Sequence, residues 1–323
     1  MAPQTGLHHS TEVIVSGAFA LVSAPRAPIT PTRWAALPAK LARMDRLCAL
    51  ALVAADGAIL DAALDPAGGA ECSGERTAVV LGTAYGCHAT NEDYYRGLLA
   101  QGAGGASPRL FAYTLPSSPV GEISIHYGIR GPATAVAPGL TAGLDALTAG
   151  LRELRAGRAD RVLVTAAEVA SPLLEQLLQN GLTISQNGST IPLSDGAAAL
   201  VLERASDAAA RGATPRGRIL ATASAYASGA RGAAVEVAAQ RALAAADLGP
   251  GAIAQVLGSP FDAAAIRPLG IEAPAHDEAP GTLGAAPLLS ASRWLCGPAG
   301  IALVVAGDPE GNGAAALLST DAR

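Results

Sequence analysis

A short stretch in the middle of the chain has the arrangement of a nucleophile-bearing turn. Residues 133–137 are predicted to form a small apolar strand, and Pro138-Gly139 then force a sharp bend into a helix. The first residue of such a helix lies against free backbone N–H groups and the positive end of the helix dipole, which activate a nucleophile. In this chain that position is Leu140, whose hydrocarbon side chain has no nucleophilic atom.

One other pair has residue types that could act as a nucleophile and a base. Cys87 and His88 are the one place in the sequence where a thiol is next to an imidazole. Adjacent residues on an extended backbone point to opposite sides, so neighbours in sequence seldom form a nucleophile–base pair. We therefore interpret this pair as structural and keep Cys87 only as an alternative nucleophile.

The elements that position these residues alternate between apolar strands and helices. Strands are predicted at residues 12–20, 77–82, 133–137, 161–167, 195–203, 218–225, 253–258, 301–306 and 313–319. Helices are predicted at residues 40–60, 91–101, 144–154, 171–180, 233–246 and 283–295. Irregular segments are predicted at residues 25–38 and 110–119 and in a Pro-rich loop after residue 258, and residues 120–127 have an amphipathic pattern. This alternation predicts a layered α/β fold.

The two halves of the chain contain a sequence echo. The predicted strand DGAAALVLE, residues 195–203, resembles NGAAALLST, residues 312–320, and each follows a buried helix and an apolar strand. A duplicated half-unit is the simplest interpretation. We expect an N-terminal half over residues 1–203 and a shortened C-terminal half over residues 204–323, joined by a charged, Ala-rich hinge at residues 204–216.

Composition excludes several classes of function. The chain has 323 residues, of which 50% are hydrophobic, with a net charge of −5 and 3% aromatic residues. A nucleic-acid surface needs basic stripes and stacking rings, so no nucleic-acid partner is expected. The four cysteines form no CxxC pair and do not cluster with the five histidines, which predicts reduced thiols and no metal. The glycines lack the lysine and the strand-to-helix placement of a phosphate cradle, so no cofactor is expected.

The sequence also predicts where the protein acts. The first twelve residues, MAPQTGLHHSTE, lack a charged segment followed by an apolar one, so no signal peptide is expected. No apolar run approaches the length that spans a bilayer. We expect a cytoplasmic protein without a membrane segment.

Several motifs together resemble the β-ketoacyl synthases of the elongating, thiolase-fold type. No single motif is specific, but the combination is, and it covers most of residues 40–203 strongly and residues 216–323 weakly. The resemblance implies a thiolase-like fold with αβαβα layers and two pseudo-duplicated halves. The motifs are RMDR at residues 43–46, GIRGPATAV at 128–136, LRAGRADRVLVTAAE at 154–168, SDGAAALVLE at 194–203 and GTLGAAPLLSASRWL at 281–295.

The catalytic residues of that family are missing at each matching position. Its nucleophilic cysteine aligns with Leu140, and its second histidine aligns with Gly281. Its first histidine would lie within residues 259–268, which contain none, and its lysine falls near His276. Its Phe-containing gate has become GDPEGNG at residues 307–313. The scaffold is thus retained without the groups that bind the acyl chain and assist decarboxylation.

This pattern resembles the chain length factor, the non-condensing partner in type II polyketide and aryl-polyene ketosynthase pairs. Such proteins often have glutamine at the nucleophile position, and Leu140 departs from that as well. The resemblance implies a heterodimer with an active β-ketoacyl synthase and contact with acyl carrier protein through the complex. In resembling dimers a residue near Leu110 enters the partner's acyl tunnel, so Leu110, Phe111, Pro138 and Leu140 are tunnel or interface candidates, and the loop around Cys87 lies near the interface.

Two other functions stay open at this point. The chain could be an enzyme with relocated chemistry, a malonyl decarboxylase or acyl transferase that uses Cys87 or Thr141. It could also be a homodimeric scaffold that binds carrier proteins without a ketosynthase partner.

Overall fold

The computed structural model describes residues 12–23, 29, 43–64, 74–181, 185–186, 189–190, 192–276 and 281–320. The strands are β1 Val13–Ser23, β2 Thr77–Gly82, β3 Ala133–Val136, β4 Arg161–Glu168, β5 Ser185–Gln186, β6 Ser189–Thr190, β7 Asp195–Arg204, β8 Gly217–Tyr226, β9 Gln255–Leu257, β10 Ala275–His276, β11 Gly300–Gly307 and β12 Asn312–Thr320. The α-helices are α2 Arg46–Asp61, α3 His88–Gln101, α4 Pro108–Phe111, α5 Ser118–Tyr127, α6 Ala142–Arg155, α7 Pro172–Gly181, α8 Ala205–Ala210, α9 Arg231–Ala245, α10 Pro260–Ala265 and α11 Ala286–Leu295. Short 3₁₀ turns are η1 Gly102–Gly105, η2 Pro250–Ala252, η3 Arg267–Leu269 and η4 Leu283–Ala285.

The main sheet has a strand order that reads the same from both ends. Its order is β10-β9-β11-β12-β8-β1-β7-β4-β2-β3. In each half the three outer strands are parallel and the two inner strands pair antiparallel. The sequence echo is explained by this symmetry, because β7 and β12 occupy mirrored places. The boundary at residues 203/204 stays a prediction.

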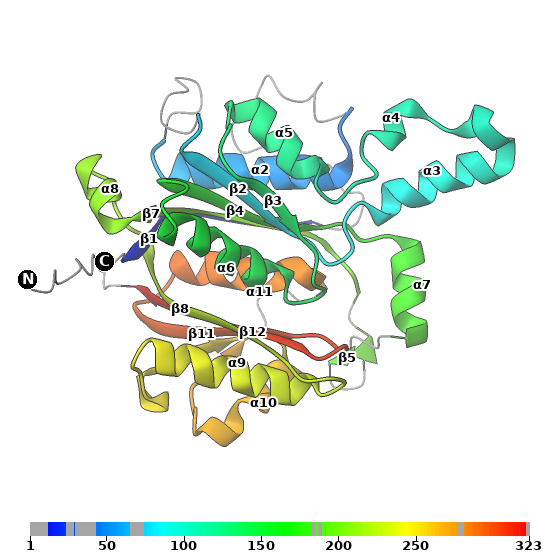
Figure 1. The fold of residues 1–323 in the computed structure, drawn as a ribbon. Coiled ribbons are helices and arrows are strands. Elements are labelled where there is room, and N and C mark those ends of the chain that lie inside the picture. The colour runs from blue at the N-terminus through cyan, green and yellow to red at the C-terminus, as the bar shows by residue number, and fades with distance from the viewer. Residues whose placement is uncertain are drawn as a thin grey trace, which may run out of the picture.

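The two halves of the sheet meet along a short seam and separate into two layers. Residues 13–15 of β1 pair antiparallel with residues 217–219 of β8. Helices α6 and α11 lie between the layers, α2 and α5 cover one outer face, and α9 and α10 cover the other (Figure 1). The predicted layered α/β fold is therefore confirmed.

The central helix α6 forms where the leucine spacing predicts it. Leu144, Leu147, Leu151 and Leu154 are all buried in the core between the layers. Burial of a leucine side chain contributes roughly 1.5–3 kcal/mol relative to its exposure to water, so this face holds the helix in place. The chain leaves the helix through Gly157, which has the left-handed φ of +67°.

The predicted start of the helix at residues 40–60 is wrong. A helix was expected from Lys40, but residues 43–45 are not helical and α2 begins at Arg46. The reason is Asp45, whose carboxylate accepts hydrogen bonds from the backbone N–H groups of Leu47 and Cys48 and so caps the helix. Residues 40–42, and nearly all of the predicted irregular segment at 25–38, lie outside the described residues.

Two predicted irregular segments contain helices. Ser107 caps the short helix α4, and α5 begins at Ser118 within the segment that was expected to be irregular. The amphipathic pattern that follows is helical, because Val120, Ile123 and Tyr127 are its buried residues. The Pro-rich loop after β9 likewise contains α10, which Ser259 caps.

Two of the cysteines differ in their burial. Cys48 is buried in α2, as a core residue on an apolar helix face should be, whereas Cys296 is exposed at the end of α11.

In the part of the chain that the structure describes, no helix has the length and apolar character needed to cross a membrane.

The outer helices approach the sheet closely at glycine positions. A Cβ on Gly17 of β1 would lie 2.1 Å from the carbonyl oxygen of Ala58 in α2. A Cβ on Gly313 of β12 would lie 2.3 Å from the backbone of Ala234 in α9. Both distances are far shorter than any real contact of a Cβ, so each half of the sheet requires a glycine beneath its outer helix.

We predict that Gly17→Ala destabilises the chain by more than about 2 kcal/mol, because the added methyl group must displace helix backbone. The matched control is Gly121→Ala on α5, where a Cβ meets no atom within 4 Å. That substitution should stabilise the chain by about 0.5–1 kcal/mol through helix propensity. Urea unfolding of the two variants measures both effects, and equal stabilities would contradict the close approach of α2.

Candidate functional site

The turn between β3 and α6 has the sharp geometry that its sequence predicts. Gly139 has a φ of +97°, which favours glycine, and a Cβ there would lie 2.7 Å from Oδ2 of Asp308. Leu140 follows, and α6 begins at Ala142. The turn therefore places Leu140 at the N-terminal end of a buried helix, where an active site of this design would have its nucleophile.

Leu140 contributes to a small apolar cluster. The half-buried side chains of Leu140 and Tyr85 pack against the buried members of this cluster. Hydrocarbon contacts occupy the space beside the helix start, and the buried members of this cluster have no nucleophilic side-chain atom. The buried members are Ala170, Leu174, Leu178, Leu193 and Leu283.

The second expected catalytic position lies beside the first. On α6, a Cβ at Gly143 would be 3.1 Å from the carbonyl oxygen of Gly284, so the starts of α6 and α11 touch. Gly281 precedes η4 and α11, has a φ of +80°, and would place a Cβ 2.3 Å from the carbonyl oxygen of Pro192. A histidine could not adopt this backbone without a shift of the chain. The backbone at Gly281 therefore excludes the imidazole that is expected at this position.

The carboxylate of Asp308 lies against the turn between β3 and α6. Oδ1 of Asp308, a buried residue, accepts hydrogen bonds from the backbone N–H groups of Gly311 (3.1 Å) and Asn312 (2.9 Å). The amide of Asn312 donates to Oδ2 of Asp308 at 2.8 Å and to the carbonyl of Pro138 at 3.3 Å. These bonds tie residues 307–313 to the turn and give the segment a fixed conformation. The sequence indicated that residues 307–313 differ from the family's Phe-containing gate. It did not indicate that Asp308 and Asn312 fix the conformation of this segment.

Comparison with known proteins identifies the scaffold. The profile of the family described as beta-ketoacyl synthase, N-terminal domain, matches residues 26–208, which is more than half of the chain. The chain belongs to the β-ketoacyl synthase family. The resemblance found in the sequence motifs is therefore confirmed.

Related sequences from this family match about half of the chain. The tetracenomycin polyketide synthase ketoacyl synthase alpha subunit of Streptomyces glaucescens is 32% identical over 198 residues, covering 54% of this chain and 46% of that protein. Nodulation protein E of Rhizobium leguminosarum bv. trifolii is 31% identical over 190 residues, covering 54% of this chain and 45% of that protein. The chain spans about half the length of these curated relatives.

Solved structures match nearly the whole chain. The ishigamide ketosynthase/chain length factor has a TM-score of 0.78 and 24% identity, covering 95% of this chain and 99% of that one. A β-ketoacyl synthase from Burkholderia phymatum STM815 has a TM-score of 0.83 and 18% identity, covering 96% of this chain and 100% of that one. These likenesses confirm the predicted thiolase-like ketosynthase fold.

The segment where the family's first histidine would lie contains no histidine. Residues 259–268, where the first histidine of the family would lie, form α10 and η3 instead. Within α10, Asp262 is buried and pairs with Arg231 at 2.7 Å. His276, which matches the region of the family's lysine, is exposed in β10. The matching positions thus form structural contacts in this ketosynthase-like chain.

The alternative nucleophile Cys87 has an unfavourable environment. Its side chain is 3% exposed, and its thiol donates a hydrogen bond to the carbonyl of Leu115 at 3.3 Å. Burial, together with the carboxylates of Asp45 and Glu168, raises the pKa of the thiol to about 12, so the thiol is protonated at neutral pH. His88 is engaged elsewhere, since its Nε2 lies 3.0 Å from the hydroxyl of Ser171. These contacts favour a structural role for the pair, and the use of Cys87 as a nucleophile stays a prediction.

The other alternative, Thr141, is also buried. Asp145, one turn further along α6, accepts a hydrogen bond from the hydroxyl of Ser224 at 3.0 Å. Burial raises the pKa of Asp145, and the neighbouring Asp308 adds to the shift. The position of Thr141 offers a hydroxyl without an exposed path or a histidine beside it, and its use as a nucleophile stays a prediction.

The interface candidates lie on a face with many exposed apolar side chains. Phe111 is 63% exposed and its ring lies 5.8 Å from that of Tyr94, whereas Leu110 beside it is half-buried. Leu99 on α3 and Ile125 on α5 are 84% and 77% exposed. The neighbouring strand β3 is the outermost strand of its half, with an open backbone edge. Helices α3 and α4 extend away from the layers beside this edge (Figure 1).

Glu168, at the end of β4, is a fully buried acid next to the site. Its Oε1 accepts hydrogen bonds from the hydroxyl of Thr83 at 3.1 Å and from the backbone N–H of Ala84. Its Oε2 has no hydrogen-bond partner among the described residues. Burial raises the pKa of this carboxyl to about 8, although the hydrogen bonds oppose the shift. Thr83 and Glu168 are 85 residues apart in the sequence, so the sequence alone does not pair them.

We predict that the stability of the chain falls between about pH 5 and pH 8 because of Glu168. The folded chain retains this proton up to about pH 8, whereas the unfolded chain releases it near pH 4.5. Glu168→Gln removes the titration, so the variant should gain about 3–5 kcal/mol relative to the wild type as the pH rises from 5 to 8.

Urea unfolding at pH 5, 6, 7 and 8 measures this dependence. Glu75→Gln, at an exposed position, is the control and should leave the pH profile unchanged. If the profile of Glu168→Gln matched the wild type, Glu168 would be ionised in the folded chain and the prediction would be wrong.

Proposed function

We propose that this chain is a non-catalytic ketosynthase-like subunit, a chain length factor. It pairs with an active β-ketoacyl synthase in polyketide, polyene or fatty-acid-like biosynthesis and bounds the acyl tunnel of that partner. The observation that carries the proposal is Leu140, packed in an apolar cluster at the position where the family has its nucleophile.

The surroundings of the turn support the absence of condensing activity. Condensation needs a thiolate and two donors that stabilise the enolate. At Gly281 the backbone leaves no room for an imidazole, and the Asp308 segment is tied to the turn by its own hydrogen bonds. A single cysteine at position 140 would therefore not restore activity, because the other groups would still be missing.

The exposed apolar face supports a protein partner. Leu99, Phe111 and Ile125 expose large apolar side chains on α3, α4 and α5, all within the connection between β2 and β3. Exposed large apolar side chains and the outer edge of β3, which pairs with no strand on its outer side among the described residues, are features that a protein partner covers in many assemblies. A second ketosynthase fold, with a matching edge strand, is the partner that we propose.

The relatives support a ketosynthase-like subunit of polyketide biosynthesis. One relative is an alpha subunit of a polyketide synthase, and one structural neighbour is a ketosynthase/chain length factor. Another neighbour, with a TM-score of 0.77 and 18% identity, is described as a type II polyketide acyl-carrier protein in complex with its ketosynthase. We extend these partners to this chain as proposals: an active ketosynthase subunit, acyl carrier protein through the complex, and assembly in the cytoplasm.

We predict that this chain co-purifies in a one-to-one complex with an active type II β-ketoacyl synthase when the two are co-expressed. The double variant Leu99→Glu, Ile125→Glu should abolish the complex, because association would bury two unpaired carboxylates in an apolar interface. Val237→Glu, on the outer helix α9, is the control and should leave the complex intact. Size-exclusion chromatography with mass determination of the co-expressed proteins measures the outcome.

Other results would favour the rival functions. A stable homodimer that does not exchange subunits with the ketosynthase would support a carrier-protein scaffold. An acyl adduct on Cys87 or Thr141, found by intact-mass analysis after incubation with acyl-loaded carrier protein, would support relocated chemistry. Either result would contradict the proposed role.

We also predict that Phe111→Ala lengthens the products of the complex by at least one extender unit. The exposed ring of Phe111 would limit the space for the growing chain in the partner's tunnel, and its removal would extend that space. Mass spectrometry of the products measures their length. Phe261→Ala, at an exposed aromatic residue on α10, is the control. Identical product lengths in all three proteins would show that Phe111 does not bound the tunnel.

A further inference from the structure

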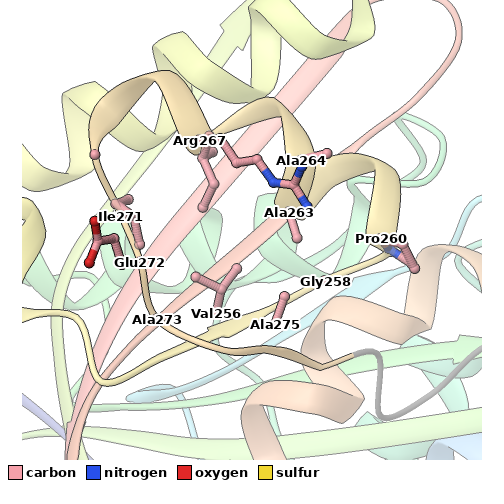
Figure 2. Close-up of a pocket in the computed structure, with 12 residues that line it drawn as sticks. Val256, Gly258, Pro260, Ala263, Ala264, Arg267, Ile271, Glu272, Ala273 and Ala275 are labelled. Carbon is pink, nitrogen blue, oxygen red and sulfur yellow. The ribbon is translucent and has the colours of Figure 1, made fainter.

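A cavity lies in the C-terminal half, away from the turn at Leu140. It has a volume of about 590 Å³ and lies between the strands β9 and β10 and the segment that contains α10 and η3. Figure 2 shows the lining residues, with Val256 on the strand side and Ala263 and Arg267 on the covering segment. This volume is within the range of about 300–1,000 Å³ that is typical of small-molecule sites.

The cavity exists because the connection above these strands is short. In the N-terminal half, residues 83–132 connect β2 to β3 and include α5, which buries Val120 and Ile123. In the mirrored place, residues 258–274 connect β9 to β10 with only α10 and η3. The space that a longer helix covers in one half is therefore only partly covered in the other.

The floor of the cavity is apolar and belongs to the core. Val256, Ile266 and Ile271 are buried members of the hydrophobic cluster that also includes side chains of α9 and β11. Gly270, with a φ of +75°, ends η3 and reverses the chain over the cavity. The floor is thus a fixed surface of branched side chains that belong to the core.

The rim of the cavity has an arginine without a counter-ion. Arg267 is exposed, and no described residue forms an ion pair with it. Its guanidinium lies near Ala263 and Ala264, whereas the carboxylate of Glu272 is at the opposite side of the cavity (Figure 2). A guanidinium is the side chain best suited to bind a carboxylate through two parallel hydrogen bonds.

We propose that this cavity binds an amphipathic carboxylate of medium chain length, with its carboxylate on Arg267 and its hydrocarbon chain on Val256, Ile266 and Ile271. A protein helix does not fit the space. Ten helical residues occupy about 1,200 Å³, from a length of about 15 Å and a diameter of about 10 Å, which is twice the cavity volume. The site is separate from the turn at Leu140 and does not depend on the proposed pairing with a ketosynthase.

Isothermal titration calorimetry of the full-length chain with hexanoate, octanoate and decanoate tests the proposal. Where the chain is obtained with its ketosynthase partner, the complex is titrated and the partner alone is subtracted. The affinity should rise about fourfold for each methylene group that enters the cavity. Arg267→Gln should weaken decanoate binding by about tenfold or more, because it removes the charge-assisted pair. Arg155→Gln, at an exposed arginine on α6, is the matched control and should bind as the wild type does.

Two further measurements decide between the expected site and simpler explanations. Ala263→Trp fills the cavity and should abolish binding, with circular dichroism used to check that the variant is folded. Decanol, which lacks the charge, should bind at least tenfold more weakly than decanoate. Equal binding of decanoate to wild type and Arg267→Gln, an affinity independent of chain length, or full binding by a folded Ala263→Trp variant would each overturn the proposal. None of these outcomes changes whether the chain forms a complex with a ketosynthase.

Discussion

The contact between the two central helices is the constraint on which the rest of the structure depends. Helices α6 and α11 approach so closely that a Cβ on Gly143 would lie 3.1 Å from the backbone of Gly284 and from the side chain of Leu288. The contact lies near the start of both helices, so the turns that lead into them, at Leu140 and Gly281, are brought to one place. The meeting of the turns at Leu140 and Gly281 is therefore a consequence of core packing, and it does not depend on which side chains the turns carry.

The place where the two turns meet is occupied by side chains that contribute to the fold. The groups near the turn are the apolar cluster around Leu140, the buried acids Glu168 and Asp308, and the half-buried Asp145. Glu168 keeps its proton up to about pH 8, so near neutral pH this carboxyl adds no negative charge at the turn. An acid near the N-terminal end of α6, such as Asp145, stabilises the fold. The groups at the turn therefore contribute to the fold through packing and hydrogen bonds.

Much of the fold follows from local patterns, and the site follows from them only in part. The leucine spacing of α6, the apolar strands and the turn at Gly139 are predictable because each depends on neighbouring residues. The short helices α4 and α10 were missed because serine caps rather than apolar periodicity define them. The left-handed Gly281 against Pro192, and the bond from Asn312 to Pro138, join residues far apart in the sequence, so only the structure could identify them.

The difference between the two halves indicates how one duplicated design serves two purposes. In the N-terminal half the long connection between β2 and β3 builds α3, α4 and α5, and with them the apolar face that includes Phe111. In the C-terminal half the mirrored connection is short, and the same place above the sheet is a cavity with Arg267 at its rim. Neither connection contributes to the contact between α6 and α11, so both can change in length while the core is unchanged. The functions that we propose for this chain are therefore placed in these two connections, outside the turn at Leu140.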